Sequence, residues 1–285
     1  MLHVDLSVSV VIFKPNLILL NRTLESLRLA IFYLRARRNR ALSISIALVN
    51  NGADVMPDTW ASVFKRDAIE YKVIAGHGNI GYGRGHNLAL EYLASDFHLI
   101  LNPDVEMAED ALIHALNFFD KHPEIGLLAP HVSGQDGMTQ YLCRRYPTVL
   151  DLFARGFLRG KAQALFAQRL ARYELRDLII DKSTTHEQAN QMTDTFISPK
   201  IISGCYMIFR MDVLKKLNGF DPRYFLYFED YDLSLRASAI ARIAYVPAIR
   251  IVHFGGDASK KGWRHIRMFT ISAYRFFNRF GWRWL

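Results

Sequence analysis

Residues 8–37 read VSVVIFKPNLILLNRTLESLRLAIFYLRAR, and within them a short apolar run passes into a helical pattern. Residues 8–13 are mostly β-branched, as expected of a buried strand. From Leu17 to Arg37 the apolar side chains recur every three or four positions, which predicts a helix with one apolar face. A strand that leads directly into a helix is the repeating unit of a parallel sheet.

The same alternation continues through the first half of the chain. We expect strands at Ser43–Val49, Tyr71–Ala75, Phe97–Leu101 and Gly126–Pro130, and helices at Gly85–Leu93 and Ala108–Lys121. This pattern predicts an α/β fold with a mostly parallel central sheet and helices on both faces. Ligands of such sheets bind beyond the carboxyl ends of the strands.

The second half of the chain is less regular. We expect a basic amphipathic helix at Arg144–Arg176 and shorter helices at Asp212–Leu217 and Asp230–Ala241. Strands are expected at Ile201–Arg210 and Ala244–Val246. We find no internal repeat and no Gly/Ser linker. We therefore expect one continuous domain over residues 1–256, followed by a basic, aromatic helical tail over residues 257–285.

The composition excludes several classes of protein. With 285 residues, 51% of them hydrophobic, the chain can bury a large core, which excludes a disordered chain, a collagen and a coiled coil. Cys143 and Cys205 are too few for a disulfide framework and lack the spacing of a zinc site, so we expect a reducing cytosol. Met1–Val11 resembles a first strand more than a signal peptide, and we expect no transmembrane helix.

Positive charge is the unusual feature of the composition. The formal net charge is +9, the sequence pI is about 9.6, and 13% of the residues are aromatic. Nucleic acid, an anionic membrane surface and a polyanionic small molecule would all be attracted by such a chain.

A carboxylate follows one of the predicted strands directly. Asn102-Pro103-Asp104 comes after Phe97–Leu101. A carboxylate at a strand end suits a divalent cation, which would then bridge phosphate oxygens. The alternative is that Asp104 only caps the helix that follows.

A second acidic cluster, Glu229, Asp230 and Asp232, lies at a turn before a predicted helix. One of these carboxylates could act as the general base that deprotonates a hydroxyl nucleophile. The alternative is a helix N-terminus made acidic to suit its dipole.

A glycine-rich stretch, GHGNIGYGRGHN, occupies residues 76–87. Glycines let the backbone approach a ligand closely, and Arg84 and His86 add positive character that suits a diphosphate. The stretch lacks the Gly-Lys-Ser/Thr of a P-loop, so a plain flexible loop is the alternative. His253, which two glycines follow, is either a metal ligand or a structural histidine.

Five segments of the chain resemble the sequence motifs of one protein family, and they occur in the same order as in that family. The resemblance extends from Val8 to about Gly256. The segments are NIGYGRGHN (79–87), LILNPD (99–104), SGCYM (203–207), GFD (219–221) and FLYFEDYDLSLR (225–236). On these motifs the chain resembles the inverting family 2 glycosyltransferases with the GT-A fold, especially the bacterial rhamnosyltransferase-like branch.

The resemblance implies a GT-A catalytic domain, in which residues 1–130 bind a nucleotide-diphosphate sugar and residues 131–256 bind the acceptor. It implies that Asp104 and His253 hold Mg²⁺ or Mn²⁺ on the diphosphate. Asp230 matches the catalytic base that deprotonates the acceptor hydroxyl, with Glu229 in support. The implied donor contacts are Asn50, Asn79, Gly81, Arg84, Asn87, Asn102 and Asp104, and the implied acceptor contacts are Gly204, Glu229 and Asp232.

Two strand ends depart from the family pattern. The first reads Phe13-Lys14-Pro15-Asn16 in place of a Tyr-Asn-like turn, and the second reads Asn50-Asn51-Gly52-Ala53 in place of Asp-Asn-x-Ser. Asn50 can still hydrogen-bond a pyrimidine edge. The resemblance therefore implies a dTDP- or UDP-sugar, with L-rhamnose from dTDP-rhamnose as the first choice and a UDP-hexose or UDP-GlcNAc as the alternative. The implied acceptor is a polyprenyl-diphosphate-linked glycan of O-antigen lipopolysaccharide or a related surface polysaccharide.

The tail interleaves aromatic with basic side chains. They are Trp263, Phe269, Tyr274, Phe276, Phe277, Phe280, Trp282 and Trp284, with Arg264, Arg267, Arg275, Arg279 and Arg283. This mixture predicts a helix in an anionic membrane interface, and so a cytoplasmic protein held peripherally on the inner face of the cytoplasmic membrane. The alternative is a helix packed on the core with a solvated basic face. A nucleic-acid-binding protein is an alternative from charge alone, although no recognised nucleic-acid motif is present.

Overall fold

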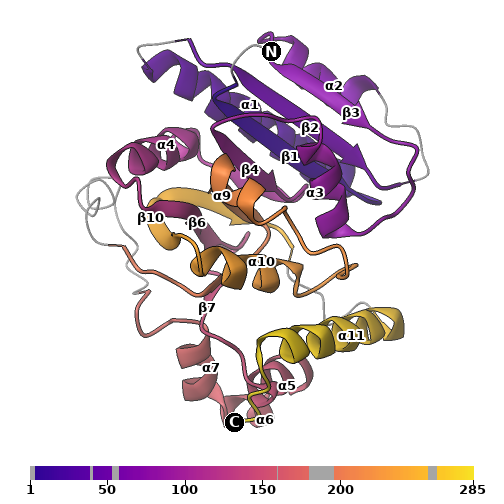
Figure 1. The fold of residues 1–285 in the computed structure, drawn as a ribbon, viewed down its shortest axis with the longest axis vertical. Coiled ribbons are helices and arrows are strands. Elements are labelled where there is room, and N and C mark those ends of the chain that lie inside the picture. Colours follow the sequence, from indigo (N-terminus) through magenta and orange to yellow (C-terminus); the bar gives the residue numbers. More distant parts are fainter. Residues whose placement is uncertain (1–3, 39–40, 53–57, 159, 180–195, 256–261) are drawn as a thin grey trace.

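The computed structural model describes residues 4–38, 41–52, 58–158, 160–179, 196–255 and 262–285. Strands and helices alternate over residues 6–101, and their order is less regular after that (Figure 1). The strands are β1 (Leu6–Ile12), β2 (Ile44–Asn50), β3 (Glu70–Ile74), β4 (Phe97–Leu101), β5 (Val105–Met107), β6 (Ile125–Ser133), β7 (Cys143–Arg144), β8 (Ile201–Ile202), β9 (Tyr206–Arg210) and β10 (Arg242–His253). The helices are α1 (Leu17–Arg37), α2 (Asp58–Lys65), α3 (Tyr82–Leu90), α4 (Ala111–Lys121), α5 (Val149–Phe157), α6 (Lys161–Ala164), α7 (Ala167–Tyr173), α9 (Met211–Lys216), α10 (Glu229–Ser238) and α11 (Trp263–Phe280).

Eight strands of the described chain form one sheet in the order β3-β2-β1-β4-β9-β6-β10-β5. β1 pairs in parallel with β2 and β4, β2 pairs in parallel with β3, and β6 pairs in parallel with β10. β9 and β5 run antiparallel to their neighbours. The predicted mostly parallel sheet is therefore confirmed, and β7 and β8 form a separate two-stranded ribbon.

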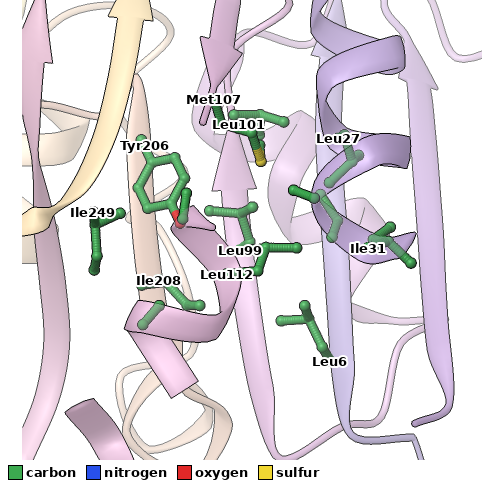
Figure 2. Close-up of a cluster of buried hydrophobic side chains, with 14 of the residues drawn as sticks. Leu6, Leu27, Ile31, Leu99, Leu101, Met107, Leu112, Tyr206, Ile208 and Ile249 are labelled. Carbon is green, nitrogen blue, oxygen red and sulfur yellow. The ribbon is translucent and has the colours of Figure 1, made fainter. Parts of the chain in front are cut away.

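One face of the sheet is covered by α1 and α4. Leu27 and Ile31 of α1 and Leu112 of α4 pack with strand residues such as Leu99 and Ile208, and all five are fully buried (Figure 2). Burial of one such side chain contributes about 1.5–3 kcal/mol. The helix predicted from the apolar spacing of residues 17–37 is therefore confirmed, and its apolar face packs on the sheet.

The opposite face of the sheet is covered by α3, α9 and α10. Ala89 of α3 packs against Val49, while Leu214 of α9 and Leu233 of α10 pack with Phe209. The three helices bring the glycine-rich stretch and the Glu229 turn to the same side of the sheet, and this placement sets up the candidate site.

Several predicted boundaries were wrong. The basic stretch expected as one helix over Arg144–Arg176 is the strand β7 followed by α5, α6 and α7. A capping box starts α5, where Thr148 and Asp151 each bond the other's backbone N–H. Gly160, with φ of 56°, precedes α6, and this left-handed conformation cannot continue a helix. The expected strand Ile201–Arg210 is interrupted between β8 and β9, and α2, β5 and β7 were not predicted.

The C-terminal helix α11 packs on the rest of the protein. Phe276 and Phe277 are buried in a cluster with Leu152, Phe228 and Tyr231. In Figure 1, α11 lies near α5, α6 and α7 at the end of the molecule that carries the C-terminus. Within the described ranges, none of the helices combines the length and apolarity that a membrane crossing requires.

Candidate active site

The first pair of functional side chains meets where two strands end. Asp104 lies between β4 and β5, and His253 is the last residue of β10, where it is paired with Val105. The N–H of Phe254 donates to the carbonyl of Asp104 at 3.0 Å, which ties the two segments together. As a result, Nε2 of His253 lies 3.6 Å from Oδ1 of Asp104. The structure therefore brings the two predicted metal ligands side by side.

The surroundings of this pair fit a divalent cation. Oδ1 of Asp104 and Oδ1 of Asn102 are buried and have no hydrogen-bond partner within the described residues. A Cβ on Gly255 would lie 2.5 Å from Oδ2 of Asp104 and 2.8 Å from Nε2 of His253, so a larger residue there would displace these two side chains. Carboxylate and amide oxygens with one imidazole nitrogen are suitable ligands for Mg²⁺ or Mn²⁺.

The described part of the chain contains no group of three or more His, Cys, Asp or Glu side chains that could hold a metal. Asp104 and His253 are thus a two-residue set. Such a set leaves coordination positions for phosphate oxygens or water, as in sites where Mg²⁺ is held by few carboxylates and by the substrate.

Glu229 and Asp230 begin helix α10 after a strained turn. Tyr227 and Phe228 have φ of 71° and 64°, a left-handed conformation that costs about 1–3 kcal/mol for each non-glycine residue. Packing holds this turn, because the ring of Phe228 lies 5.2 Å from the ring of Phe276 in α11. The turn therefore sets the positions of Glu229 and Asp230 at the start of α10.

The two adjacent carboxyl groups differ in their partners. Oδ2 of Asp230 accepts from the N–H of Gly204 and Oδ1 accepts from the N–H of Tyr231, both at 2.9 Å. Oε2 of Glu229 is buried with no hydrogen-bond partner among the residues described. Burial raises the pKa of both groups; the Asp230 charge raises that of Glu229 further, whereas Gly204 and the Arg144 guanidinium oppose the rise at Asp230. These partners favour a negative charge on Asp230 over one on Glu229.

Arg144 is a buried cation that contacts Tyr231, the residue after Asp230. It donates to the hydroxyl of Tyr231, and that oxygen lies 2.8 Å from the hydroxyl of Tyr173 at the end of α7. Burial alone would lower the pKa of Arg144, but Tyr231, Tyr173 and Asp230 together hold it above its usual value. The guanidinium is therefore charged, and it links α7 to the residue that follows the base.

The glycine-rich stretch is locked to the turn before α10. Gly81 has φ of 94°, and a Cβ there would lie 2.4 Å from the carbonyl oxygen of Phe225. The N–H of Tyr82 donates to the same carbonyl at 3.1 Å. Glycine is required here because both the backbone conformation and the close approach exclude a side chain.

Tyr82 lies between the two functional pairs. Its hydroxyl donates to the carbonyl of Gly204 at 2.5 Å. Burial raises the pKa of Tyr82, and the charges of Glu229, Asp230 and Asp104 raise it further. The N–H of Asn102 donates to the carbonyl of Cys205 at 2.9 Å, so the segment that carries Asp104 is joined to the segment that holds Asp230.

Asparagines at the end of β2 brace the glycine-rich stretch. Nδ2 of Asn51 donates to the carbonyl of Gly81 at 2.9 Å, and Oδ1 of Asn79 accepts from the N–H of Gly81 at 3.1 Å. Asn50 is buried, and its Oδ1 accepts from the N–H of Gly52 at 2.9 Å. The three predicted donor residues Asn50, Asn79 and Gly81 thus lie within one connected segment.

Two expected donor contacts are used within the protein. Arg84 is exposed, and its Nε donates to the carbonyl of Pro222 at 2.6 Å. The amide of Asn87 donates to the carbonyl of Phe220 at 2.7 Å and accepts from the Phe220 N–H at 2.8 Å. Both residues hold the segment before the Glu229 turn against α3, and their expected contacts with the donor stay predictions.

The expected acceptor contact of Asp232 also needs correction. Asp232 is fully buried, with Oδ1 2.5 Å from Nε of Arg236 and Oδ2 2.8 Å from Nη1 of Arg279. Side chains that are two positions apart on a helix point in nearly opposite directions, and Asp232 therefore faces away from Asp230. It anchors α11 to α10 and does not line the site.

Three residues of the site were not among the predicted ones. Arg144 was hidden in a stretch assigned to a basic helix, and nothing in the sequence singled out Gln140, whose Oε1 lies 3.1 Å from Nδ1 of His253. Gly255 had a visible signal, since it directly follows the His253 segment, but only the packing shows why it is glycine.

Comparisons with known proteins support the fold and the class of protein. No protein-family model matches the chain. The rhamnosyltransferase WbbL of Escherichia coli K12 is 27% identical over 212 residues, which cover 71% of this chain and 72% of that protein. The N-acetylglucosaminyl-diphospho-decaprenol L-rhamnosyltransferase of Mycobacterium tuberculosis H37Rv is 24% identical over 223 residues, which cover 74% of this chain and 66% of that protein.

Solved structures share the fold over nearly the whole chain. Staphylococcus aureus TarS 1–349 in complex with UDP-GlcNAc has a TM-score of 0.56 at 16% identity, covering 96% of this chain and 67% of that one. GalNAc-T7 with UDP, GalNAc and Mn²⁺ has a TM-score of 0.58 at 14% identity, covering 89% of this chain and 43% of that one.

The fold and these relatives define the class of protein, a glycosyltransferase with the GT-A fold. Within that class the chain is similar to bacterial rhamnosyltransferases, at 27% and 24% identity.

Proposed function

We propose that this protein is a metal-dependent, inverting enzyme that transfers L-rhamnose from dTDP-rhamnose to a lipid-linked glycan during surface polysaccharide synthesis. One observation carries the proposal: Asp230 accepts from the N–H groups of Gly204 and Tyr231, and the residue after Gly204, Cys205, accepts from the N–H of Asn102 on the segment that carries Asp104 beside His253. A base next to a set of cation ligands is what hydroxyl attack on a nucleotide-diphosphate sugar requires.

Asp230 would take the proton from the acceptor hydroxyl. The hydroxyl oxygen then bonds to the anomeric carbon from the face opposite the nucleotide, while the bond from that carbon to the diphosphate oxygen breaks. The nucleoside diphosphate leaves with the bonding electrons, and the configuration at the anomeric carbon inverts. Glu229, which keeps its proton beside the charged Asp230, can donate a hydrogen bond to the acceptor.

Asp104 and His253 would hold Mg²⁺ or Mn²⁺, which when bound supplies Lewis-acid neutralisation of the charge on the diphosphate. The open space beside Gly255 and the unpartnered Asn102 Oδ1, within the described chain, are where phosphate oxygens would approach. Both GalNAc-T7 and a mannosyltransferase of Pyrobaculum calidifontis were solved with Mn²⁺ and a nucleotide or nucleotide sugar.

The sugar and the acceptor are proposed from the relatives. The mycobacterial protein is named for an L-rhamnosyl transfer and for a diphospho-decaprenol acceptor. Asn50, at the end of β2, offers an amide to a pyrimidine edge, so a UDP-sugar is the second candidate donor. The acceptor would be a polyprenyl-diphosphate-linked glycan.

A lipid-linked acceptor requires contact with a membrane, and α11 is the proposed contact. Its inner face is packed on the core, but Trp263 is 77% exposed beside the exposed Arg264 and Arg267, and Trp284, which follows the end of the helix, is 64% exposed. Aromatic rings with arginines suit the headgroup region of an anionic leaflet, on the inner face of the cytoplasmic membrane. Sedimentation with vesicles containing phosphatidylglycerol, but not with neutral vesicles, is the expected result.

A donor screen tests the proposed function. A ligand that binds only the folded protein raises its melting temperature. With Mn²⁺ present, dTDP-rhamnose should raise the Tm more than UDP-GlcNAc or GDP-mannose, and excess EDTA should remove most of the shift. No shift with any nucleotide sugar would contradict the proposal, and a larger shift with a UDP-sugar would select the second donor.

A further inference from the structure

A tight hairpin after β6 places Gln140 next to His253 at the end of β10. The N–H of Gly134 donates to the carbonyl of Met138, and the N–H of Gln140 donates to the carbonyl of Val132, both at 2.8 Å. β6 lies beside β10 in parallel register, so this hairpin ends next to the last residues of β10. Gln140 thereby reaches His253 across 113 positions of sequence.

The Gln140 amide contacts His253 at two atoms. Nε2 of Gln140 donates to the backbone carbonyl of His253 at 3.0 Å. Oε1 of Gln140 lies 3.1 Å from the ring Nδ1 of the same residue. Because a carbonyl can only accept a hydrogen bond, the amide nitrogen must face it, and the amide oxygen must then face the ring. The usual ambiguity between the two amide orientations is removed by this pair of contacts.

The amide orientation fixes the tautomer of His253. An amide oxygen can only accept, so Nδ1 must carry the hydrogen. In the neutral ring Nε2 is then left with its lone pair, and this is the atom 3.6 Å from Oδ1 of Asp104. The side chain of His253 is only 12% exposed, which limits rotation of the ring away from this direction.

We propose that Gln140 is a positioning residue that fixes the ring orientation and tautomer of His253, so that Nε2 is presented to the cation beside Asp104. The inference rests on the proposed function, because it concerns the same cation site. Ligating histidines in proteins are generally held in this way by a hydrogen bond from the distal ring nitrogen, and loss of that partner weakens metal binding about 10- to 100-fold.

The test compares Gln140→Met with Gln140→Glu and with a control in the same hairpin. Methionine keeps the length of the side chain but offers His253 neither bond. Glutamate keeps an oxygen acceptor for Nδ1 and loses only the bond to the carbonyl. Gln135→Met is the matched control, since Gln135 is exposed in the same turn.

Two readouts are needed for each variant. Titration calorimetry with Mn²⁺ alone gives the dissociation constant, and ¹⁵N NMR of the His253 ring in the cation-free protein gives the tautomer. We expect Gln140→Met to weaken Mn²⁺ binding about 10- to 100-fold and to lose the pure Nδ1–H form. Gln140→Glu should stay within a few-fold of the wild type, and Gln135→Met should be unchanged.

Each outcome bears on the inference differently. If the wild type binds Mn²⁺ and Gln140→Met binds it equally well, the positioning role is overturned while the proposed function stands. If Gln140→Glu is as weak as Gln140→Met although both keep the wild-type Tm, Gln140 serves the hairpin only, and the inference fails. If the wild type and His253→Ala both fail to bind Mn²⁺, the metal site of the proposed function fails as well.

Discussion

The backbone N–H of Gly204 donates to Oδ2 of Asp230 at 2.9 Å. This bond joins the segment between β8 and β9 to the first turn of α10. Tyr82 donates to the carbonyl of the same glycine, so the glycine-rich stretch, the Gly204 segment and the base form one connected unit. A Cβ on Gly204 would lie 3.2 Å from Cβ of Asp230, so a larger residue there would press on the side chain of Asp230.

Arg144→Met should shift the pH dependence of the reaction. The Arg144 charge opposes the burial that raises the pKa of Asp230, so its loss should raise that pKa further. Because the base must be ionised, the acidic limb of kcat/KM should move to higher pH, and most activity should return in alkaline buffer. The neighbouring, partly exposed Arg145 pairs with Asp177, so Arg145→Met is the control. An unshifted limb, with a uniform loss at every pH, would contradict this role.

Two buried histidines should make the fold sensitive to acid. His98 bonds the hydroxyls of Ser7 and Ser9, and Ser9 also bonds His86. Burial lowers the pKa of His98 to about 3 and that of His86 well below its usual value. Both are neutral when folded, whereas in the unfolded chain they take up protons below a pH of about 6.5.

The unfolded state therefore binds more protons between a pH of about 6.5 and about 3. Stability is fully present above that window and is lost as the pH falls through it, by up to about 1.4 kcal/mol per pH unit for each histidine. Urea unfolding of His98→Asn should show a shallower dependence on pH than the wild type. His114→Gln, a partly exposed histidine beside Asp110, is the control. Equal slopes for His98→Asn and the wild type would show that His98 is not neutral in the folded protein.

Asp232→Asn should lower stability and spare substrate binding. The change removes the charge that Arg236 and Arg279 share, and breaking a buried ion pair costs about 3–5 kcal/mol. Thermal unfolding should show the loss, while KM for the acceptor, measured well below the Tm, should stay near the wild-type value. If Asp232→Asn raises the KM for the acceptor and leaves the Tm unchanged, Asp232 contacts the acceptor as the sequence suggested, and the structural role is contradicted.

The sequence was sufficient for most of the sheet and for the position of Asp104 at a strand end. Residues 8–37 and 97–104 predicted a parallel sheet with a carboxylate at a strand end, because strand and helix periodicities are local properties. The roles of residues that depend on the orientation of a side chain were harder to predict from the sequence. Asp232 lies two positions from Asp230, and only the helix start at Glu229 shows that the two face apart.

Other parts of the site depend on contacts far apart in the chain. Asn87 is paired with Phe220, and Gln140 with His253. No local pattern marks such pairs, because their geometry is set by the register of β6 with β10 and by the packing of α3. Arg144 was missed for the same reason, since its hydrogen-bond partner Tyr231 lies 87 positions later.

Transfer by Asp230→Asn tests the central claim most directly. Asparagine keeps the shape of the side chain and can still accept from Gly204, but it cannot take the acceptor proton. Single-turnover transfer from dTDP-rhamnose to a polyprenyl-diphosphate-linked glycan, with Mn²⁺, should be about 10²- to 10⁴-fold slower than in the wild type. The Tm shift produced by the donor should be unchanged. Transfer at the wild-type rate would contradict the assignment of Asp230 as the base.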